Sequence, residues 1–184
     1  QVVKQVAGTS GYLKVLDLCG APGGKSTHLS SLIGPESLLV SNEVIRQRSD
    51  ILAENITRWG TANTIVTRND PSAFSRLPGF FDMILVDAPC SGEGMFRDKI
   101  AVTEWSVGNT LLCAERQRRI LADVWPALRP GGILVYSTCT FNPGENEENV
   151  AGGPLFCIST DHGVLCKPLG AAGTSPGWLC SGNA

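Results

Sequence analysis

The sequence predicts an α/β protein built on a doubly wound, mostly parallel sheet. Short apolar segments alternate with segments whose apolar residues recur at helical spacing, which is typical of repeated βαβ units. A glycine-rich loop follows the first apolar segment, and two later apolar segments run into loops that each carry a cysteine. Because the carboxyl ends of parallel strands meet at one edge of a sheet, we expect these three loops to share that edge.

The expected elements follow one another in a regular order along the chain. Apolar runs predict strands over residues 14–19, 37–43, 63–67, 81–87 and 132–137. Helical spacing predicts a helix from the glycine-rich loop to about residue 33, a helix over 44–59 that Gly60 caps, a short helical stretch over 73–77, and a helix over 111–128 that residues 129–132 end. Residues 88–110 are expected to form a long functional loop.

Composition and charge limit the classes of protein that fit. The chain has 184 residues, 42% of them hydrophobic, which suffices for one domain with a core. The net charge of −2 provides no overall basic field, so any binding of nucleic acid must come from a local patch. No apolar run approaches the roughly 20 residues of a membrane span. Since the chain begins with Gln1 rather than Met, we expect a piece of a longer protein.

The seven cysteines are odd in number, widely spaced and without a C-x-x-C pair. This pattern indicates neither a disulfide framework nor a metal site. We therefore expect a soluble protein of a reducing, cytoplasmic compartment, with no metal and no membrane partner.

Two regions differ in composition. Residues 1–150 carry the expected core, whereas residues 151–184 hold seven glycines, three prolines and only two charged residues. Residues 155–160 and 164–167 flank Asp161-His162-Gly163, which predicts a hairpin that adds two antiparallel strands beside the fifth strand. An irregular tail is the alternative.

Two strand ends carry thiols. Asp87 and Cys90 leave the same strand in the segment FDMILVDAPCSGEGMF, residues 81–96, and Cys139 follows the strand over 132–137. Each has an ordinary explanation, since Asp often starts a turn and a single cysteine is commonly a small buried hydrophobe. The expected meeting of these strand ends favours a shared functional site instead.

The glycine-rich loop matches neither common nucleotide-binding pattern. A P-loop needs glycine where Cys19 stands, and the fingerprint G-x-G-x-x-G is absent. A tight turn followed by Glu43 at the end of the second strand suits a nucleoside cofactor without a pyrophosphate, such as S-adenosylmethionine. A carboxylate at this position accepts hydrogen bonds from the ribose hydroxyls. A carboxylate that opposes a helix dipole explains Glu43 equally well, and Asp70 is either an adenine contact or a cap.

Such a cofactor and two thiols together indicate methylation of cytosine. Carbon C5 of cytosine is a poor nucleophile, and addition of a thiolate at C6 makes C5 able to attack a sulfonium methyl group. We expect Asp87 to hydrogen-bond the N3 and N4 edge of the pyrimidine and to stabilise the charge that develops at N3. The second thiol assists loss of the C5 proton or release of the enzyme. By spacing alone, Cys90 and Cys139 are each able to fill either role.

Four ordered motifs resemble the Sun-type RNA cytosine-5 methyltransferases, with the best match to the bacterial small-subunit rRNA branch. They are DLCGAPGGKST at 17–27, DAPCSGEGMF at 87–96, RQRRI at 116–120, and YSTCTFN at 136–142 with ENEEN at 145–149. The resemblance covers residues 11–150. It implies a Rossmann-like class I methyltransferase fold, S-adenosylmethionine as the cofactor and RNA, most simply rRNA, as the partner.

The resemblance also implies roles for individual residues. Cys139 becomes the nucleophile that attacks C6, and Cys90 the helper needed for release. The cofactor is then held by Cys19, Gly20, Ala21, Pro22, Gly23, Gly24, Lys25, Glu43, Arg48, Asp70 and Asp87.

The chain departs from the family pattern at two places. Gly20 stands where the family usually has Ala, which we expect to be harmless, and Arg97-Asp98-Lys99 moves a charge in a loop that should face RNA. The upstream and C-terminal regions that help family members bind RNA are not recognisable here. Arg116, Arg118 and Arg119 are candidates for phosphate contacts, although a solvated helix face is their ordinary explanation.

Two other functions compete with this interpretation. The first is a non-catalytic RNA-binding or ribosome-binding remnant of the same fold, because the substrate-binding ends are missing from the pattern. The second is a P-loop nucleotide hydrolase.

Overall fold

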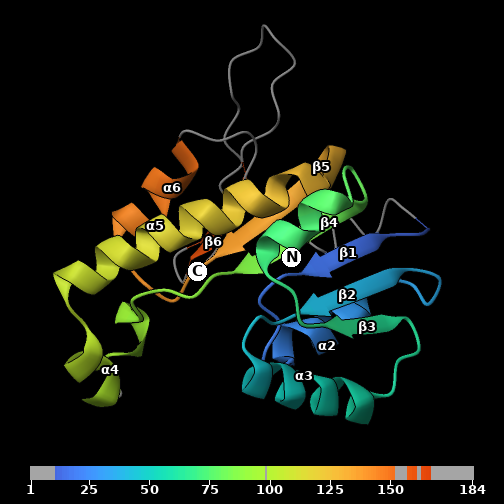
Figure 1. Cartoon of the computed structure of the whole chain (residues 1–184), viewed down its shortest axis with the longest axis horizontal. Helices are drawn as coiled ribbons and strands as arrows, with labels where there is room; N and C mark the ends of the chain where they lie inside the picture. The colour runs from blue at the N-terminus through green and yellow to red at the C-terminus, as the bar shows by residue number, and fades with distance from the viewer. Residues whose placement is uncertain (1–10, 98, 152–156, 161–162, 167–184) are drawn as a thin grey trace, which may run out of the picture. The chain divides into compact units, whose positions relative to one another are not determined.

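The computed structural model describes residues 11–97, 99–151, 157–160 and 163–166 (Figure 1). Its strands are β1 (Lys14–Asp17), β2 (Leu38–Asn42), β3 (Thr64–Thr67), β4 (Phe81–Asp87), β5 (Leu128–Ser137), β6 (Cys157–Thr160) and β7 (Gly163–Cys166). They follow the order β3-β2-β1-β4-β5-β6-β7. Strand β1 is parallel to both β2 and β4, so the winding reverses at β1. This confirms the predicted doubly wound, mostly parallel sheet.

Helices connect these strands. The α-helices are α2 (Gly24–Leu32), α3 (Arg46–Trp59), α4 (Lys99–Glu104), α5 (Val107–Val124) and α6 (Glu147–Ala151). Short 3-10 helices are η1 (Pro71–Arg76), η2 (Glu93–Met95), η3 (Trp125–Ala127) and η4 (Pro143–Glu145). Within the described part of the chain, none of the helices has the length and apolar character needed to cross a membrane.

The chain divides into two compact units. The first unit comprises residues 1–86 and 123–132, and the second comprises residues 87–122 and 133–184.

In the first unit, α3 packs its apolar side on the neighbouring elements. Leu52 and Ile56 of α3 form a buried cluster with Ala21, and Val66 of β3 packs against it. The helix ends as predicted at Gly60, which adopts φ +81 and donates its N–H to Ile56 O at 3.1 Å. Figure 1 shows α3 running along β3. This packing holds the loop that contains Ala21 against α3.

The predicted end of the last long helix is wrong. Helix α5 ends at Val124 and passes into the 3-10 helix η3, because Pro126 has no N–H for a further α-helical hydrogen bond, and residues 128–132 already belong to β5. Arg129 Nε lies 2.8 Å from Asp82 Oδ1. At Gly132 a Cβ atom would stand 3.0 Å from Asp82 O, so the glycine serves close strand packing rather than a helix cap.

The predicted loop over 88–110 contains helices. It includes η2 and α4, and α5 begins at Val107 (Figure 1). Ser106 caps α5, because its side-chain oxygen accepts the N–H of Asn109 at 3.1 Å. A serine followed three residues later by Asn rather than Glu or Gln is a weak sequence signal, so the helix begins earlier than the pattern predicts.

The strands expected in the tail are present as β6 and β7. They pair antiparallel, with Thr160 opposite Gly163, but β6 is parallel to β5, not antiparallel. A short helix, α6, stands between β5 and β6 in the sequence, and β6 begins beside Val135 of β5. Residues 161–162, which hold the predicted turn with His162, and 167–184 lie outside the described residues.

Candidate active site

The predicted cofactor loop of the first unit is fastened to α3. Arg48 donates to Ala21 O at 3.0 Å, and Asn55 donates to Pro22 O at 2.7 Å. Gly23, just before α2, has φ +116, a conformation that favours glycine. Gly24 and Lys25 are exposed, and Cys19 is half-buried. The loop is thus anchored through its carbonyl groups while the start of α2 stays open.

Gly20 occupies a narrow space between hydroxyl groups. A Cβ atom there would collide with Ser41 Oγ and stand 2.9 Å from Ser26 Oγ. These two hydroxyls lie 2.6 Å apart, and Ser26 donates to Asp17 Oδ2 at 2.7 Å. In this chain the glycine is therefore required by its surroundings, and an alanine would disturb them.

Glu43 presents a buried carboxylate oxygen at the end of β2. Its side chain is 3% exposed, and Oε1 accepts the N–H of Ile45 at 3.1 Å. Oε2 has no hydrogen-bond partner among the described residues, although Arg48 Nη1 lies 3.4 Å away. The charge of Oε2 is thus paired with Arg48, and a ribose hydroxyl would supply the hydrogen bond that this buried oxygen lacks. The residues of the first unit therefore fit a nucleoside cofactor.

Asp70 acts as a helix cap. Its Oδ1 accepts the N–H of Ser72 at 3.0 Å and the Ser72 hydroxyl at 2.6 Å, which fixes the start of η1. Of the two explanations offered by the sequence, the structure thus contains the capping role, and the adenine contact stays a prediction.

In the second unit, the two predicted catalytic cysteines lie side by side. Cys90 Sγ and Cys139 Sγ are 2.8 Å apart, and both residues are thiols rather than a disulfide. Cys139 N also donates to Cys90 Sγ at 3.2 Å. Cys139 is exposed, whereas Cys90 is half-buried. Loops that are 49 residues apart in the sequence therefore bring both sulfurs to one place.

The contact between the thiols makes them chemically different. A hydrogen bond from the Cys90 side chain lowers the pKa of Cys139 from 9.0 to about 7, against the opposing effects of burial and of the negative charges of Asp87 and Glu145. The same hydrogen bond, together with burial, raises the pKa of Cys90 above its ordinary value. Cys139 is accordingly the better thiolate, and Cys90 keeps its proton.

Asp87 belongs to the same group. Its Oδ1 accepts the Ser137 hydroxyl at 2.8 Å, and Ala88 N donates to Ser137 O at 2.8 Å. These bonds tie the end of β4 to the end of β5, the strands from which the two thiol loops emerge. Asp87, Cys90 and Cys139 are therefore gathered within the second unit.

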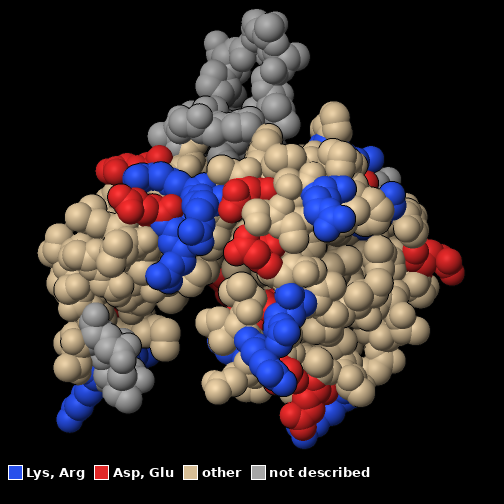
Figure 2. Space-filling model, viewed as in Figure 1, with Lys and Arg blue, Asp and Glu red and all other residues tan. Residues whose placement is uncertain are grey.

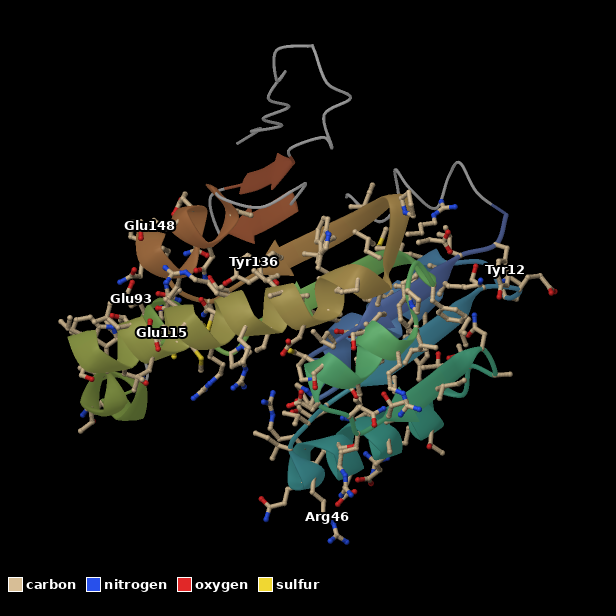
Figure 3. The ribbon with its side chains drawn as sticks, turned by 45° about the horizontal axis from the view of Figure 1, so that its top comes forward. Tyr12, Arg46, Glu93, Glu115, Tyr136 and Glu148 are labelled. Atoms are coloured by element: carbon tan, nitrogen blue, oxygen red, sulfur yellow. The ribbon has the colours of Figure 1, made fainter. Side chains whose placement is uncertain are left out.

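Glu93 connects the loop of Cys139 to Trp105. One carboxylate oxygen accepts the Trp105 indole N–H at 3.2 Å, and the other accepts the N–H of Phe141 at 3.2 Å (Glu93 is labelled in Figure 3). Gly94 N donates to Cys139 O at 2.8 Å. No sequence pattern distinguishes Glu93, because a single acidic residue in a loop is common.

The basic residues of α5 face solvent in a mixed environment. Arg116, Arg118 and Arg119 are all exposed. Figure 2 shows basic side chains gathered over α5 with acidic ones beside them, and Glu115, labelled in Figure 3, is one exposed acidic residue of that helix. Their role as phosphate contacts stays a prediction.

The chain matches known proteins over most of its length. The family described as 16S rRNA methyltransferase RsmB/F matches residues 9–153. Ribosomal RNA small subunit methyltransferase F of Salmonella heidelberg (strain SL476) is 47% identical over 137 residues, which are 73% of this chain and 29% of that protein. The protein of the same name from Serratia proteamaculans (strain 568) is 42% identical over 166 residues, 89% of this chain and 34% of that protein.

A solved structure shares the fold. The crystal structure of NSun6 from Pyrococcus horikoshii with SFG has a TM-score of 0.70 at 31% identity, and the match covers 82% of this chain and 38% of that one. The chain thus spans about a third of the length of the relatives it matches.

Proposed function

Since the chain belongs to the 16S rRNA methyltransferase RsmB/F family and has a Rossmann-like methyltransferase fold, we propose that residues 1–150 are the catalytic core of an S-adenosylmethionine-dependent RNA methyltransferase. It transfers a methyl group to C5 of cytosine, in ribosomal RNA and in the cytoplasm, through a covalent bond between Cys139 and C6. The observation that carries this proposal is the 2.8 Å contact between the sulfurs of Cys90 and Cys139.

The proposed reaction begins at Cys139. Its thiolate, favoured by a pKa of about 7, forms the bond to C6, and the electron pair of the C5–C6 double bond moves toward C5 and the N3 side of the ring. One oxygen of the Asp87 carboxyl group accepts a hydrogen bond from the N4 amino group, and the other, when it carries a proton, donates to N3 and so stabilises the negative charge that develops there. The cofactor supplies the electrophilic methyl group that C5 takes up.

Release requires the opposite events. Solvent water takes up the C5 proton, the electron pair of the C5–H bond restores the C5–C6 double bond, and the bond from C6 to the Cys139 sulfur breaks with its electron pair staying on sulfur. Cys90 assists this release, because its thiol lies beside the departing sulfur and donates a hydrogen bond to the returning thiolate. A thiol at Cys90 and a thiolate at Cys139 are the protonation states that the contact favours.

The cofactor would be held mostly by residues of the first unit. Glu43 would accept hydrogen bonds from the ribose hydroxyls with Oε2, which forms an ion pair with Arg48 but accepts no hydrogen bond among the described residues. The loop from Cys19 to Lys25, with Arg48 and Asp70, and Asp87 of the second unit would complete the predicted set. The NSun6 relative contains SFG, an analogue of S-adenosylmethionine, which supports this choice of cofactor.

The test follows the covalent intermediate. We expect wild-type protein to transfer a methyl group from S-adenosylmethionine to an RNA pool, and Cys139→Ser to abolish this transfer. We expect Cys90→Ala to accumulate a protein–RNA adduct that survives denaturant. An adduct that forms in Cys139→Ala instead would show that the two thiol roles are reversed.

Calorimetry separates this function from its alternatives. We expect adenosylhomocysteine to bind and ATP not to bind. Binding of ATP would indicate a nucleotide hydrolase, and cofactor binding without methyl transfer to any RNA would indicate a non-catalytic RNA-binding protein.

A further inference from the structure

Two fully buried polar residues of the second unit have no role in the proposed reaction. Gln117 of α5 and Glu145 of η4 are both 0% exposed, and Gln117 Nε2 donates to Glu145 Oε1 at 2.9 Å. Burying a carboxylate is costly unless several donors satisfy it. The hydrogen-bond donors around Glu145 therefore indicate which part of the chain Gln117 and Glu145 hold in place.

Gln117 and Glu145 hydrogen-bond the backbone on both sides of Cys90. Gln117 Nε2 donates to the carbonyl of Pro89, the residue before Cys90, at 3.0 Å. Glu145 accepts the backbone N–H of Ser91, the residue after Cys90, at 2.9 Å and the Ser91 hydroxyl at 2.5 Å. Hydrogen bonds to both neighbouring residues thus fix the position of the Cys90 backbone.

The same network reaches the loop of Cys139. Ser91 Oγ lies 3.1 Å from Thr140 Oγ1, and Thr140 Oγ1 accepts the N–H of Asn142 at 3.2 Å. Because the Ser91 proton is already given to Glu145, Thr140 must be the donor to Ser91. The residue next to Cys139 is therefore hydrogen-bonded to the residue next to Cys90.

The pair is itself held rigidly. The Tyr136 hydroxyl donates to Glu145 O at 2.7 Å, and Asn149 Nδ2 donates to Gln117 Oε1 at 2.8 Å (Tyr136 is labelled in Figure 3). Tyr136 is 0% exposed and Asn149 is buried. A rigid support matters because a hydrogen bond between sulfurs weakens steeply when its geometry is lost.

We propose that Gln117 and Glu145 are positioning residues that hold Pro89, Cys90 and Ser91 so that the Cys90 sulfur stays beside the Cys139 sulfur. The proposal deepens the function proposed above and rests on it for its catalytic meaning. The positioning itself is a property of the protein alone, and it is measured without RNA or cofactor.

The experiment measures the pH midpoint of alkylation of Cys139 by iodoacetamide, with the modified residue located by mass spectrometry. In wild-type protein we expect a midpoint of about 7. Gln117→Met keeps the length of the side chain but removes its donors. If the pair positions Cys90, the sulfurs separate in this variant and the midpoint rises toward 9.0.

Glu145→Leu gives the sharper test, because the two explanations predict opposite signs. The negative charge of Glu145 raises the pKa of Cys139, so loss of charge alone would lower the midpoint. Loss of positioning would raise it. A rise in both Gln117→Met and Glu145→Leu supports the proposal, and an unchanged or lower midpoint in either folded variant overturns it.

Two further variants control for a general loss of stability. Ser37→Ala, in the first unit, removes a buried acceptor of the Leu13 N–H and should leave the midpoint at about 7. Ser91→Ala removes a single hydroxyl, so it tests the positioning of Cys90 even if the larger substitutions fail to fold. We expect it to raise the midpoint by less than Cys90→Ala does, and no rise in folded protein would contradict the proposal.

Methyl transfer to RNA is measured separately on the same variants. If wild-type protein transfers no methyl group while Gln117→Met still raises the midpoint, the proposed function fails and the positioning stands. If transfer occurs but the midpoint does not move, the positioning fails and the function stands.

Discussion

Removal of the Cys90 thiol should make Cys139 a less acidic cysteine. The hydrogen bond from Cys90 is the largest influence that lowers the pKa of Cys139 to about 7, whereas burial and the charges of Asp87 and Glu145 act in the opposite direction. Without that bond the remaining influences return the pKa to at least its ordinary value of 9.0. We therefore expect Cys90→Ala to shift the titration of Cys139 to higher pH.

The size of the effect follows from these two pKa values. The thiolate forms as pH rises through the pKa, so at pH 7 about half of Cys139 is thiolate in wild-type protein and about 1% in Cys90→Ala, a loss of about 50-fold. A Cys139 thiolate with the higher pKa is about 8-fold more nucleophilic than the wild-type thiolate, because nucleophilicity rises with basicity. At pH 7 alkylation of Cys139 should therefore slow about 6-fold.

The assay is the rate of iodoacetamide alkylation of Cys139 between pH 5 and 10. We expect the midpoint to move from about 7 to about 9 in Cys90→Ala, and to stay lower in Cys90→Ser, whose hydroxyl still donates a hydrogen bond. A midpoint that stays near 7 in Cys90→Ala would refute the reasoning, because the acidity of Cys139 would then have another source.

Three further substitutions test the first unit. Glu43→Gln should weaken adenosylhomocysteine binding by about 10-fold or more in calorimetry, because it replaces a charged acceptor by a neutral one; unchanged affinity would exclude a ribose contact. Gly20→Ala should lower the free energy of unfolding in urea by about 1–3 kcal/mol through overpacking, whereas Gly24→Ala, whose Cβ meets nothing within 4 Å, should not; equal effects would contradict the steric argument. Gly60→Ala should cost about 1–2 kcal/mol in the same assay, since φ is +81 there, and a smaller loss would mean that the cap relaxes.

Most of the sheet was predictable from apolar runs. The strands at 81–87 and 63–67 match β4 and β3 closely, because a strand between turn residues has a local signature. Arg129 to Gly132 were misplaced because their strand assignment depends on Asp82, a partner distant in the sequence. Local pattern carries no information on such a contact.

The candidate site divides in the same way. Cys90, Cys139 and Asp87 were predicted as members of one site because each stands at the end of an apolar strand, and the structure gathers them. Which thiol is more acidic depends on a single contact between two loops, so spacing left both roles open. Gln117 was missed because a glutamine between arginines in a helix looks solvent-exposed, yet it is fully buried.

The crowded space around Gly20 restricts the order in which this chain can change. Gly20, Ser26 and Ser41 share one small volume, so substitutions at positions 20 and 41 are coupled rather than additive. Ser41→Ala would remove the nearest hydroxyl, but Ser26 Oγ would still stand 2.9 Å from a methyl group at position 20. Exchange of this glycine for the alanine typical of such loops is therefore coupled to both serines, which is a simple case of epistasis.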